Sequence, residues 1–397
     1  MSDKFFKSLD EQLRLQEERG LKINDPLGFK KYLLENNYFN IINGFETLFL
    51  KSSQPKQYYE EISTEDFRSI FELDRKISLF LFEDFSKIEM KFSTSIAYRL
   101  TESYNERSRM TQGSDNDFFM NKENYPNHND SEDLRAEYFD GHKFFQTSFP
   151  RRKVTVKNIN FTGEVSSPRE GEVLCFKGTF TGSFKGLNRN SFQGKFSVSG
   201  LDNSDSISVG NYEDFCIPEN TTGQMKCSNY SDFCKIEYPY ISKYEHPPLW
   251  VIINTLTLNE LNILYWGLEL DVKNKIIEDV GYRWVSPFSK TDEFMSYLEV
   301  MRECRNVIAH FGLITRLRTR RNLTINRSLV DSLSLQTFNG GNRIVCFWDI
   351  LKILCQVDSV DGKRIKKLIS NYLLKNMTEN KNTINKNFLD RIYKRRR

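Results

Sequence analysis

The sequence predicts a mainly α-helical protein with a strand-rich (α+β) insertion. In two long stretches, apolar residues recur at steps of three and four, which is typical of amphipathic helices. Between about residues 150 and 210, Gly, Ser and Thr alternate with aromatic or β-branched residues, a pattern typical of strands and turns. We therefore expect an N-terminal helical part over 1–105, an insertion of unknown role over 106–240, and a C-terminal helical part over 241–397.

The first hundred residues predict two short helices and then a long one. The segment "KSLDEQLRLQEERG" ends at Gly20, the residue type that best adopts the left-handed conformation after a helix. Asp25 and Pro26 then form a usual helix start. From about Ser63 to Leu100, helical spacing of apolar residues continues without proline or glycine, so we expect one long core helix or two in series.

Helical patterns return in "HPPLWVIINTLTLNELNILYWGL". A further helix is predicted from about Thr291 to Phe311, with Ser289 or Thr291 as its cap and Gly312 as its stop. Two amphipathic helices follow, in "FWDILKILCQVD" and "GKRIKKLISNYLL". We expect the remainder to be a polar tail that ends in "YKRRR".

Charge, hydropathy and cysteine content narrow the class of protein. The 57 basic and 53 acidic residues give a net charge of only +4, which by itself does not indicate a nucleic-acid binder. The sequence has no run of eighteen or more apolar residues and no signal peptide, so we expect a cytoplasmic protein without a membrane span. Seven cysteines, an odd number without a CxxC pair, agree with that compartment.

Four side chains in one loop-rich region are of types that bind zinc: Cys216, Cys227, Cys234 and His246. Structural zinc sites usually include a closely spaced pair of ligands, which this set lacks. We therefore predict no metal and no cofactor, and leave open whether these four residues bind a metal.

An arginine interrupts the apolar stripe of the helix predicted over 291–311. At about 100° per residue, Arg305 falls within a sector of roughly 140° that otherwise holds apolar residues. That sector contains Phe294, Tyr297, Leu298, Met301, Cys304, Ile308 and Phe311. Because burying an unpaired charge is costly, Arg305 needs a polar cavity or a carboxylate. Glu89 and Glu83 are the acidic partners we consider, in which case Arg305 would be purely structural.

Asn306 follows this arginine, and His310 comes five residues after it, which gives the pattern R-N-x-x-x-H. A structural alternative for His310 is a cap on the last carbonyls of the helix, where the helix dipole favours a cation. Arg135 and His142 form a second match of similar spacing, but without the asparagine and without a clear helix. We interpret that second match as chance.

The R-N-x-x-x-H pattern near the end of a long helix resembles the motif of the HEPN superfamily of metal-independent ribonucleases. Three more segments are similar, in order, to characteristic blocks of the Abi-like family, which includes the AbiD and AbiF phage abortive-infection proteins. They are "DEQLRLQEERGLKINDPLGFKKYLLENNYFNIINGF", "LDRKISLFLFEDFSKIEMKFSTSIAYRL" and "PPLWVIINTLTLNELNILYWGL". The resemblance covers most of 8–104 and 240–315. The stretch 106–240 is longer and more strand-rich than the family's usual connection, so we expect the resemblance not to extend through it.

This resemblance implies a HEPN-type helical bundle and an endoribonuclease that acts as a bacterial anti-phage abortive-infection effector or toxin. Arg305, Asn306 and His310 would then be catalytic. Histidine can move protons near neutral pH, and arginine can hold non-bridging phosphate oxygens as charge develops on them. Asn306 would orient His310 or a phosphate oxygen. The expected products, formed without Mg²⁺, carry a 2′,3′-cyclic phosphate and a 5′-hydroxyl.

Helix geometry adds a requirement for a second chain. Residues five apart on a helix point about 140° apart, so one motif makes a poor complete site. A two-fold dimer can bring Arg305 and His310 of both protomers into one cleft, and the resemblance implies the same, because HEPN nucleases usually assemble one site from two motifs. We therefore predict a homodimer.

A basic segment follows the motif and predicts RNA binding. Arg316, Arg318, Arg320 and Arg321 can make salt-dependent contacts with the phosphates of an RNA substrate. A solvated basic loop is the structural alternative. The resemblance also implies that a structured small RNA acts as an antitoxin, as in some members of the Abi-like family.

Two other functions compete with the nuclease. One is a non-catalytic module of the same fold that binds RNA or a phage protein through the basic segment. The other is a HEPN protein that is the target or partner of a nucleotidyl-modifying enzyme. The intact set of Arg305, Asn306 and His310 favours the nuclease.

Overall fold

The computed structural model divides the chain into two compact units. Unit 1 comprises Met1–Ser95 and Lys273–Arg397, and unit 2 comprises Ile96–Val272. The structure describes residues 6–108, 118–126, 134–151, 155–156, 162–166, 174–183, 191–201, 215–216, 222–227, 229–285, 290–319, 325–336, 345–376 and 381–393. Within these ranges, side chains are described except at 107, 108, 134 and 150–226.

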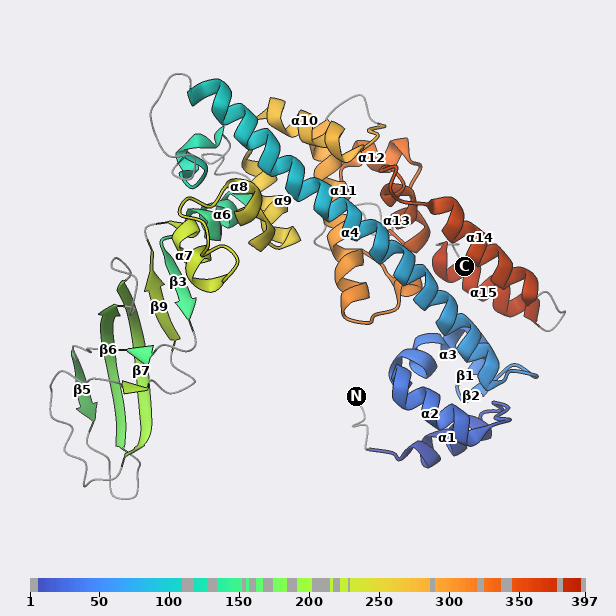
Figure 1. Ribbon diagram of the computed structural model, residues 1–397. Coiled ribbons are helices and arrows are strands. Elements are labelled where there is room, and N and C mark those ends of the chain that lie inside the picture. The colour runs from blue at the N-terminus through green and yellow to red at the C-terminus, as the bar shows by residue number, and fades with distance from the viewer. Residues whose placement is uncertain are drawn as a thin grey trace. The chain divides into compact units, whose positions relative to one another are not determined.

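Unit 1 is built mainly from helices (Figure 1). Its elements are α1 (Leu9–Glu18), α2 (Pro26–Asn36), the π-helix η1 (Phe39–Asn43), α3 (Gly44–Phe49), the hairpin strands β1 (Leu50–Ser53) and β2 (Lys56–Tyr58), most of α4 (Thr64–Ser108) and of α10 (Leu270–Val280), α11 (Lys290–Ala309), the 3-10 helix η6 (Ile314–Arg316), α12 (Arg327–Ser332), α13 (Phe347–Leu354), α14 (Gly362–Lys375) and α15 (Asn382–Ile392).

The predicted helix boundaries near the N-terminus are confirmed. Gly20 has a φ of 92°, the left-handed conformation that ends α1. The side chain of Asp25 accepts a hydrogen bond of 2.9 Å from the backbone N–H of Gly28 and so caps α2, whose first residue is Pro26. The local sequence is sufficient to predict these boundaries, because a helix cap depends on residues only three or four positions apart.

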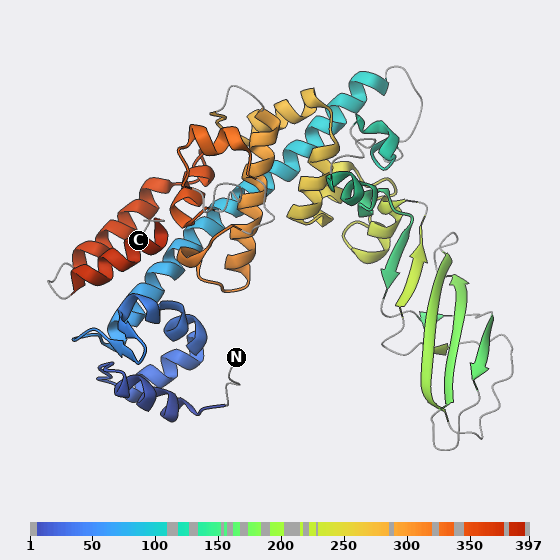
Figure 2. The ribbon, with the colours of Figure 1, turned by 180° about the vertical axis from the view of Figure 1, so that it is seen from behind.

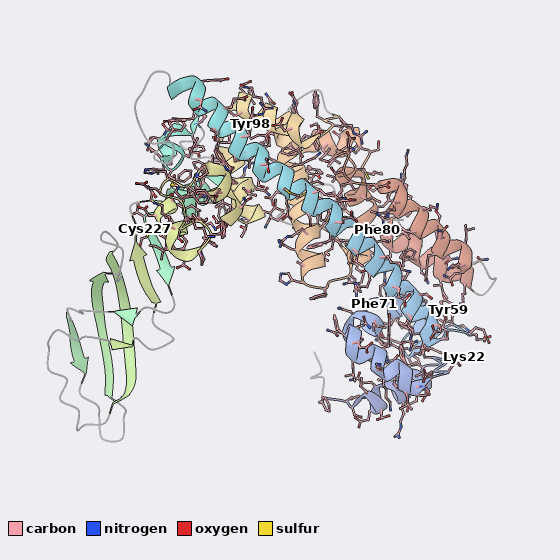
Figure 3. The ribbon with its side chains drawn as sticks, in the orientation of Figure 1. Lys22, Tyr59, Phe71, Phe80, Tyr98 and Cys227 are labelled. Carbon is pink, nitrogen blue, oxygen red and sulfur yellow. The ribbon has the colours of Figure 1, made fainter. Side chains whose placement is uncertain are left out.

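The long helix predicted from about 63 to 100 is confirmed as the single helix α4, which continues to Ser108 (Figure 1). Its apolar stripe is buried: Phe67, Ile70, Ile77, Leu81, Phe85, Ile88 and Phe92 are each at most 1% exposed. Figure 3 labels Phe71 and Phe80 on α4, and the guanidinium of Arg364 from α14 lies 3.2 Å from the centre of the Phe80 ring. Helix α4 therefore carries the core of unit 1.

The end of the chain differs from the prediction. Instead of a polar tail, residues Asn382–Ile392 form α15, which lies beside α14 in both views (Figure 1, Figure 2). Ile384, Phe388 and Ile392 are buried, and the rings of Phe388 and Tyr372 are 5.6 Å apart. Three apolar residues at four-residue steps were enough to place one face of this helix against the core.

Unit 2 contains the strand-rich insertion, which confirms this part of the predicted fold class. An antiparallel five-stranded sheet has the order β3 (Ser148–Arg151), β9 (Thr222–Lys226), β7 (Ser191–Leu201), β6 (Leu174–Ser183) and β5 (Thr162–Ser166). β4 (Thr155–Val156) and β8 (Phe215–Cys216) form a separate pair. The expected part boundaries at 105 and 240 remain predictions.

The helices of unit 2 surround its aromatic residues. They are the end of α4, the 3-10 helices η2 (Lys122–Asn124), η4 (Lys143–Phe145) and η5 (Ile253–Thr255), and α6 (Leu134–Asp140), α7 (Tyr230–Glu237), α8 (Leu249–Ile252) and α9 (Leu258–Gly267). The helical pattern predicted from "HPPLW" onward is thus confirmed. Among the described ranges, none of the helices combines the length and apolar character of a membrane span.

Candidate active site at the end of helix α11

Arg305 lies on α11 at the edge of its buried face. The apolar residues before it on that face, from Phe294 to Cys304, are buried as predicted, but the side chain of Arg305 is 40% exposed. The expectation that this guanidinium faces the core is therefore wrong. The side chain instead lies at the border between the buried face of α11 and solvent, where it meets a carboxylate of α4.

The acidic neighbour of Arg305 is Glu89 of α4. Arg305 donates from Nε to Oε1 of Glu89 over 3.3 Å, and the Glu89 side chain is 27% exposed. Glu83, the other carboxylate considered, instead forms an ion pair of 2.7 Å with Lys87 on its own helix, so that expectation is wrong. Among the described residues, the Nη groups of Arg305 donate no hydrogen bond.

Asn306 lies on the last turn of the same helix, and His310 is the first residue after it. Asn306 is partly exposed, and its carbonyl accepts the backbone N–H of His310 over 3.0 Å. The His310 side chain is exposed, and in the part of the chain that the structure describes its imidazole has no hydrogen-bond partner. The structural alternative, a cap on the last carbonyls, is therefore not formed by this side chain.

The turn after His310 is strained and tightly closed. Phe311 has a φ of 56°, which is unfavourable for a bulky residue, although its side chain is 72% exposed. Its N–H bonds to the carbonyl of Ile308 (3.0 Å), and the N–H of Gly312 bonds to the carbonyl of Val307 (2.7 Å). This is the double closure of a Schellman motif.

The sequence prediction placed the helix stop one residue too late, whereas the predicted start near Thr291 agrees with the structure. Phe311, not Gly312, adopts the left-handed conformation. Gly312 is needed for space, because a Cβ there would lie 2.8 Å from Cγ1 and 3.0 Å from the carbonyl oxygen of Val307. At the other end, α11 begins at Lys290, so Thr291 lies inside the helix, and Ser289 lies outside the described residues.

A buried carboxylate anchors the chain just after the motif. Asp74 of α4 is 0% exposed and accepts hydrogen bonds from the N–H groups of Ile314 (3.2 Å) and Thr315 (2.8 Å) and from the Thr315 hydroxyl (2.6 Å). Sequence reasoning missed Asp74. The available signal was an aspartate four residues after Ile70 and three before Ile77, which places it within the buried stripe of α4.

Two further side chains hold the strained turn itself. Arg75 donates to the carbonyl of Gly312, and Nδ2 of Asn40, on the π-helix η1, donates to the carbonyl of Phe311 over 3.1 Å. The carbonyls of the two residues in the turn are thus bonded to side chains from two other elements. His310 is therefore an exposed side chain on a rigid backbone.

The structure describes part of the predicted basic segment. Arg316 and Arg318 are both exposed, and Arg320 and Arg321 lie outside the described residues. Nη1 of Arg316 donates to the carbonyl of Asn43 over 3.3 Å. Sequence reasoning missed Arg391 of α15, which donates from Nη1 to the carbonyl of Gly44 (3.1 Å) and from Nη2 to the hydroxyl of Thr47 (2.7 Å).

The second arginine–histidine match has a structural explanation in unit 2. His142 is buried, its Nδ1 accepts the N–H of Phe144 (3.1 Å), and its Nε2 lies 3.0 Å from the carbonyl of Glu260. Desolvation lowers the pKa of His142 to about 4 despite the opposing hydrogen bond to Glu260. Nε2 therefore carries the proton of a neutral imidazole at neutral pH.

The three members of the zinc set whose side chains are described, Cys227, Cys234 and His246, do not form a group that could hold a metal ion. Cys227, labelled in Figure 3 after β9, and Cys234 are buried, whereas His246 is exposed. The Cys234 sulfur lies 3.7 Å from the Thr255 hydroxyl oxygen. The side chain of Cys216 lies outside the described part, and among the side chains that are described no three His, Cys, Asp or Glu residues are grouped to hold a metal ion.

Comparison with known families adds an independent observation. The family model for Abi-like proteins matches residues 31–164 and 171–314. The chain belongs to the Abi-like protein family. The match to this Abi-like protein runs through most of the strand-rich insertion, so the expectation that the resemblance stops there is wrong. It also includes all of α11 and ends just after His310, and membership of the family points to a role in abortive infection.

Searches of the curated proteins and of the solved structures gave no significant match to this Abi-like protein.

Proposed function

We propose that this Abi-like protein is a metal-independent endoribonuclease of the HEPN type, which acts as an anti-phage abortive-infection effector or toxin by cutting cellular RNA. One observation carries the proposal: directly after α11 the exposed His310 stands on a fixed backbone, and within the described residues the Nη groups of Arg305 on α11 donate no hydrogen bond. Family membership supports the defence role.

The chemistry needs two proton transfers and one site for negative charge. A base removes the proton of the 2′-hydroxyl, the 2′-oxygen attacks phosphorus, and the 5′-oxygen leaves with a proton from an acid. An exposed imidazole can fill the base or the acid role. The Nη groups of Arg305 can bond two non-bridging oxygens as charge develops, while Nε stays on Glu89. Asn306, on the next position, would orient a phosphate oxygen or His310.

A homodimer completes this proposal. In a two-fold pair, each protomer contributes one His310, so one imidazole removes the 2′-hydroxyl proton and the other protonates the 5′-oxygen. The exposed motif leaves this face of α11 available for such a partner. A structured small RNA, held by the basic segment that begins at Arg316, is the inhibitor we propose.

The competing function is RNA binding without cleavage, and the exposed Arg316 and Arg318 favour it as much as they favour the nuclease. A single experiment separates the two. The purified protein is incubated with end-labelled RNA in EDTA, beside His310→Ala and the matched control His246→Ala, which removes an exposed histidine of unit 2.

We expect fragments with 2′,3′-cyclic phosphate and 5′-hydroxyl ends from the wild type and from His246→Ala, and a loss of at least about 100-fold in rate for His310→Ala. Intact RNA with every variant, together with retained binding, would establish the binding module instead. Equal cutting by His310→Ala would show that the catalytic histidine has been assigned wrongly.

A further inference from the structure

Two arginines from distant parts of the chain meet at one turn of unit 1. Arg316, on η6, donates to the carbonyl of Asn43, and Arg391, on α15, donates to the carbonyl of Gly44. Asn43 and Gly44 are consecutive residues at the junction of η1 and α3. Their carbonyls therefore hold the two guanidinium groups close together, although 75 residues separate the two arginines in the sequence.

Among the described residues, no carboxylate pairs with either guanidinium. In the described residues, Arg316 and Arg391 bond only to backbone carbonyls and, for Arg391, the hydroxyl of Thr47, and neither forms an ion pair. Arg391 also lies 5.5 Å from the centre of the Phe45 ring. Arg391 is largely buried and the exposed Arg316 lies close enough to act on it, so the two positive charges repel each other, and an anion that bonds to both removes that repulsion.

Burial and the positive charge of neighbouring arginines both act on Arg391. Burial first, and then the positive charge of Arg316 with a smaller effect from Arg318, lowers the pKa of Arg391 to about 9, against the opposing charge of Asp74. The group still carries its proton at neutral pH. Asp74 is itself occupied by four donors, from Arg75, Ile314 and Thr315, so it does not neutralise the pair.

The same π-helix connects this pair to the catalytic turn. Asn40 of η1 holds the carbonyl of Phe311, directly after His310, and Asn43 at its other end holds Arg316. Gly44 packs so closely that a Cβ there would lie 2.5 Å from Cδ1 of Leu313. The arginine pair and the His310 turn are thus fixed to one short element, and π-helices recur at functional sites.

We propose that Arg316 and Arg391 together bind one backbone phosphate of the RNA substrate, beside the phosphate that is cut. The inference rests on the proposed RNA substrate and names the group that holds it. The planar guanidinium of arginine can donate two parallel hydrogen bonds to phosphate oxygens. RNA carries one negative charge at every nucleotide. A second phosphate contact at a fixed place therefore determines which nucleotide lies at the cleavage position.

Binding of a fluorescein-labelled single-stranded RNA, followed by anisotropy at several salt concentrations, tests this. All variants are made in the full-length His310→Ala protein so that the RNA stays intact. Arg316→Gln and Arg391→Gln are each expected to weaken binding about tenfold, and to reduce the slope of log K against log salt by about 0.7. The control Arg283→Gln removes an equal charge from an exposed arginine that pairs with Asp358, and is expected to change neither quantity beyond error.

Arg391 also joins α15 to α3, so its variants are checked by circular dichroism. If Arg391→Gln unfolds, Arg316→Gln decides the question, because Arg316 is exposed and makes a single bond of 3.3 Å. Unchanged affinity and slope in the folded variants, or no RNA binding by the parent protein at low salt, would overturn the phosphate site. If Arg316→Gln and Arg391→Gln weaken RNA binding but the wild type cuts no RNA, the proposed nuclease is wrong and the phosphate-binding site is supported.

Discussion

Arg305 of α11 donates from Nε to Oε1 of Glu89 on α4 over 3.3 Å, and this contact leaves the outer end of its guanidinium without a hydrogen bond among the described residues. The pair is partly exposed, at 40% and 27%, so it adds little stability. Its effect is to orient the plane of the Arg305 guanidinium. A phosphate that approaches the Nη groups meets a guanidinium that is already oriented.

Arg305→Lys is expected to lower RNA cleavage about 100-fold while the fold is kept, because lysine retains the charge but lacks the planar fork. Arg302→Lys is the matched control. Arg302 lies one turn earlier on α11 and pairs with Glu299 over 2.6 Å, so its change is expected to leave the rate within about twofold. Single-turnover cleavage rates measure both, and equal losses in the two variants would contradict the role of Arg305.

Glu89→Gln is expected to lower kcat about tenfold, because the guanidinium loses the charge that orients it. The free energy of unfolding should fall by no more than about 0.5 kcal/mol, since the pair is partly exposed. Glu83→Gln, which breaks only the ion pair with Lys87 on α4, serves as control and should leave kcat unchanged. Urea unfolding and cleavage kinetics separate the two effects, and a silent Glu89→Gln would show that orientation of Arg305 does not matter.

Phe311→Gly and Gly312→Ala are expected to change stability in opposite directions. Phe311 is 72% exposed with a φ of 56°, so glycine relieves strain at little loss of packing, and the free energy of unfolding should rise by about 1 kcal/mol. A Cβ at residue 312 would lie 2.8 Å from Cγ1 of Val307, so alanine should destabilise by a similar amount. Urea denaturation of both variants checks the signs, and a destabilised Phe311→Gly would mean that the exposed ring makes contacts of its own.

The lowered pKa of the buried His142 predicts that the free energy of unfolding falls in acid. Above its unfolded pKa, near 6.5, the imidazole is neutral in both states, and the folded protein carries no penalty. As the pH falls from about 6.5 towards the folded pKa of about 4, the unfolded chain takes up a proton that the buried ring refuses, so the free energy of unfolding falls by up to about 3 kcal/mol.

His142→Asn should remove this part of the pH dependence, because asparagine can still accept the N–H of Phe144 but does not titrate. Urea unfolding of both proteins at about pH 7 and about pH 4.5 measures the difference. Parallel curves for wild type and His142→Asn would refute the prediction.

The motif residues could be found from sequence because their signals are local. Arg305 stands out against an apolar stripe, and His310 follows at a fixed distance on the same helix. The prediction of buried residues was wrong at the end of that stripe. Phe311 fits the helical period, but it comes after the helix has ended, and its side chain is exposed. Periodicity describes a helix and stops being informative at its last turn.

By itself, the sequence determined the mainly helical class, the caps at Gly20 and Asp25, the single long helix α4, the strand-rich insertion and the R-N-x-x-x-H pattern, because each depends on neighbours within about one turn or one strand. Only the tertiary structure decided that Glu89 rather than Glu83 meets Arg305, that Asp74 anchors the segment after His310, and that Arg391 joins Arg316. Those pairs are separated by 75 to 241 residues in the chain, and they meet only where packing of α4, α11 and α15 brings their backbones together.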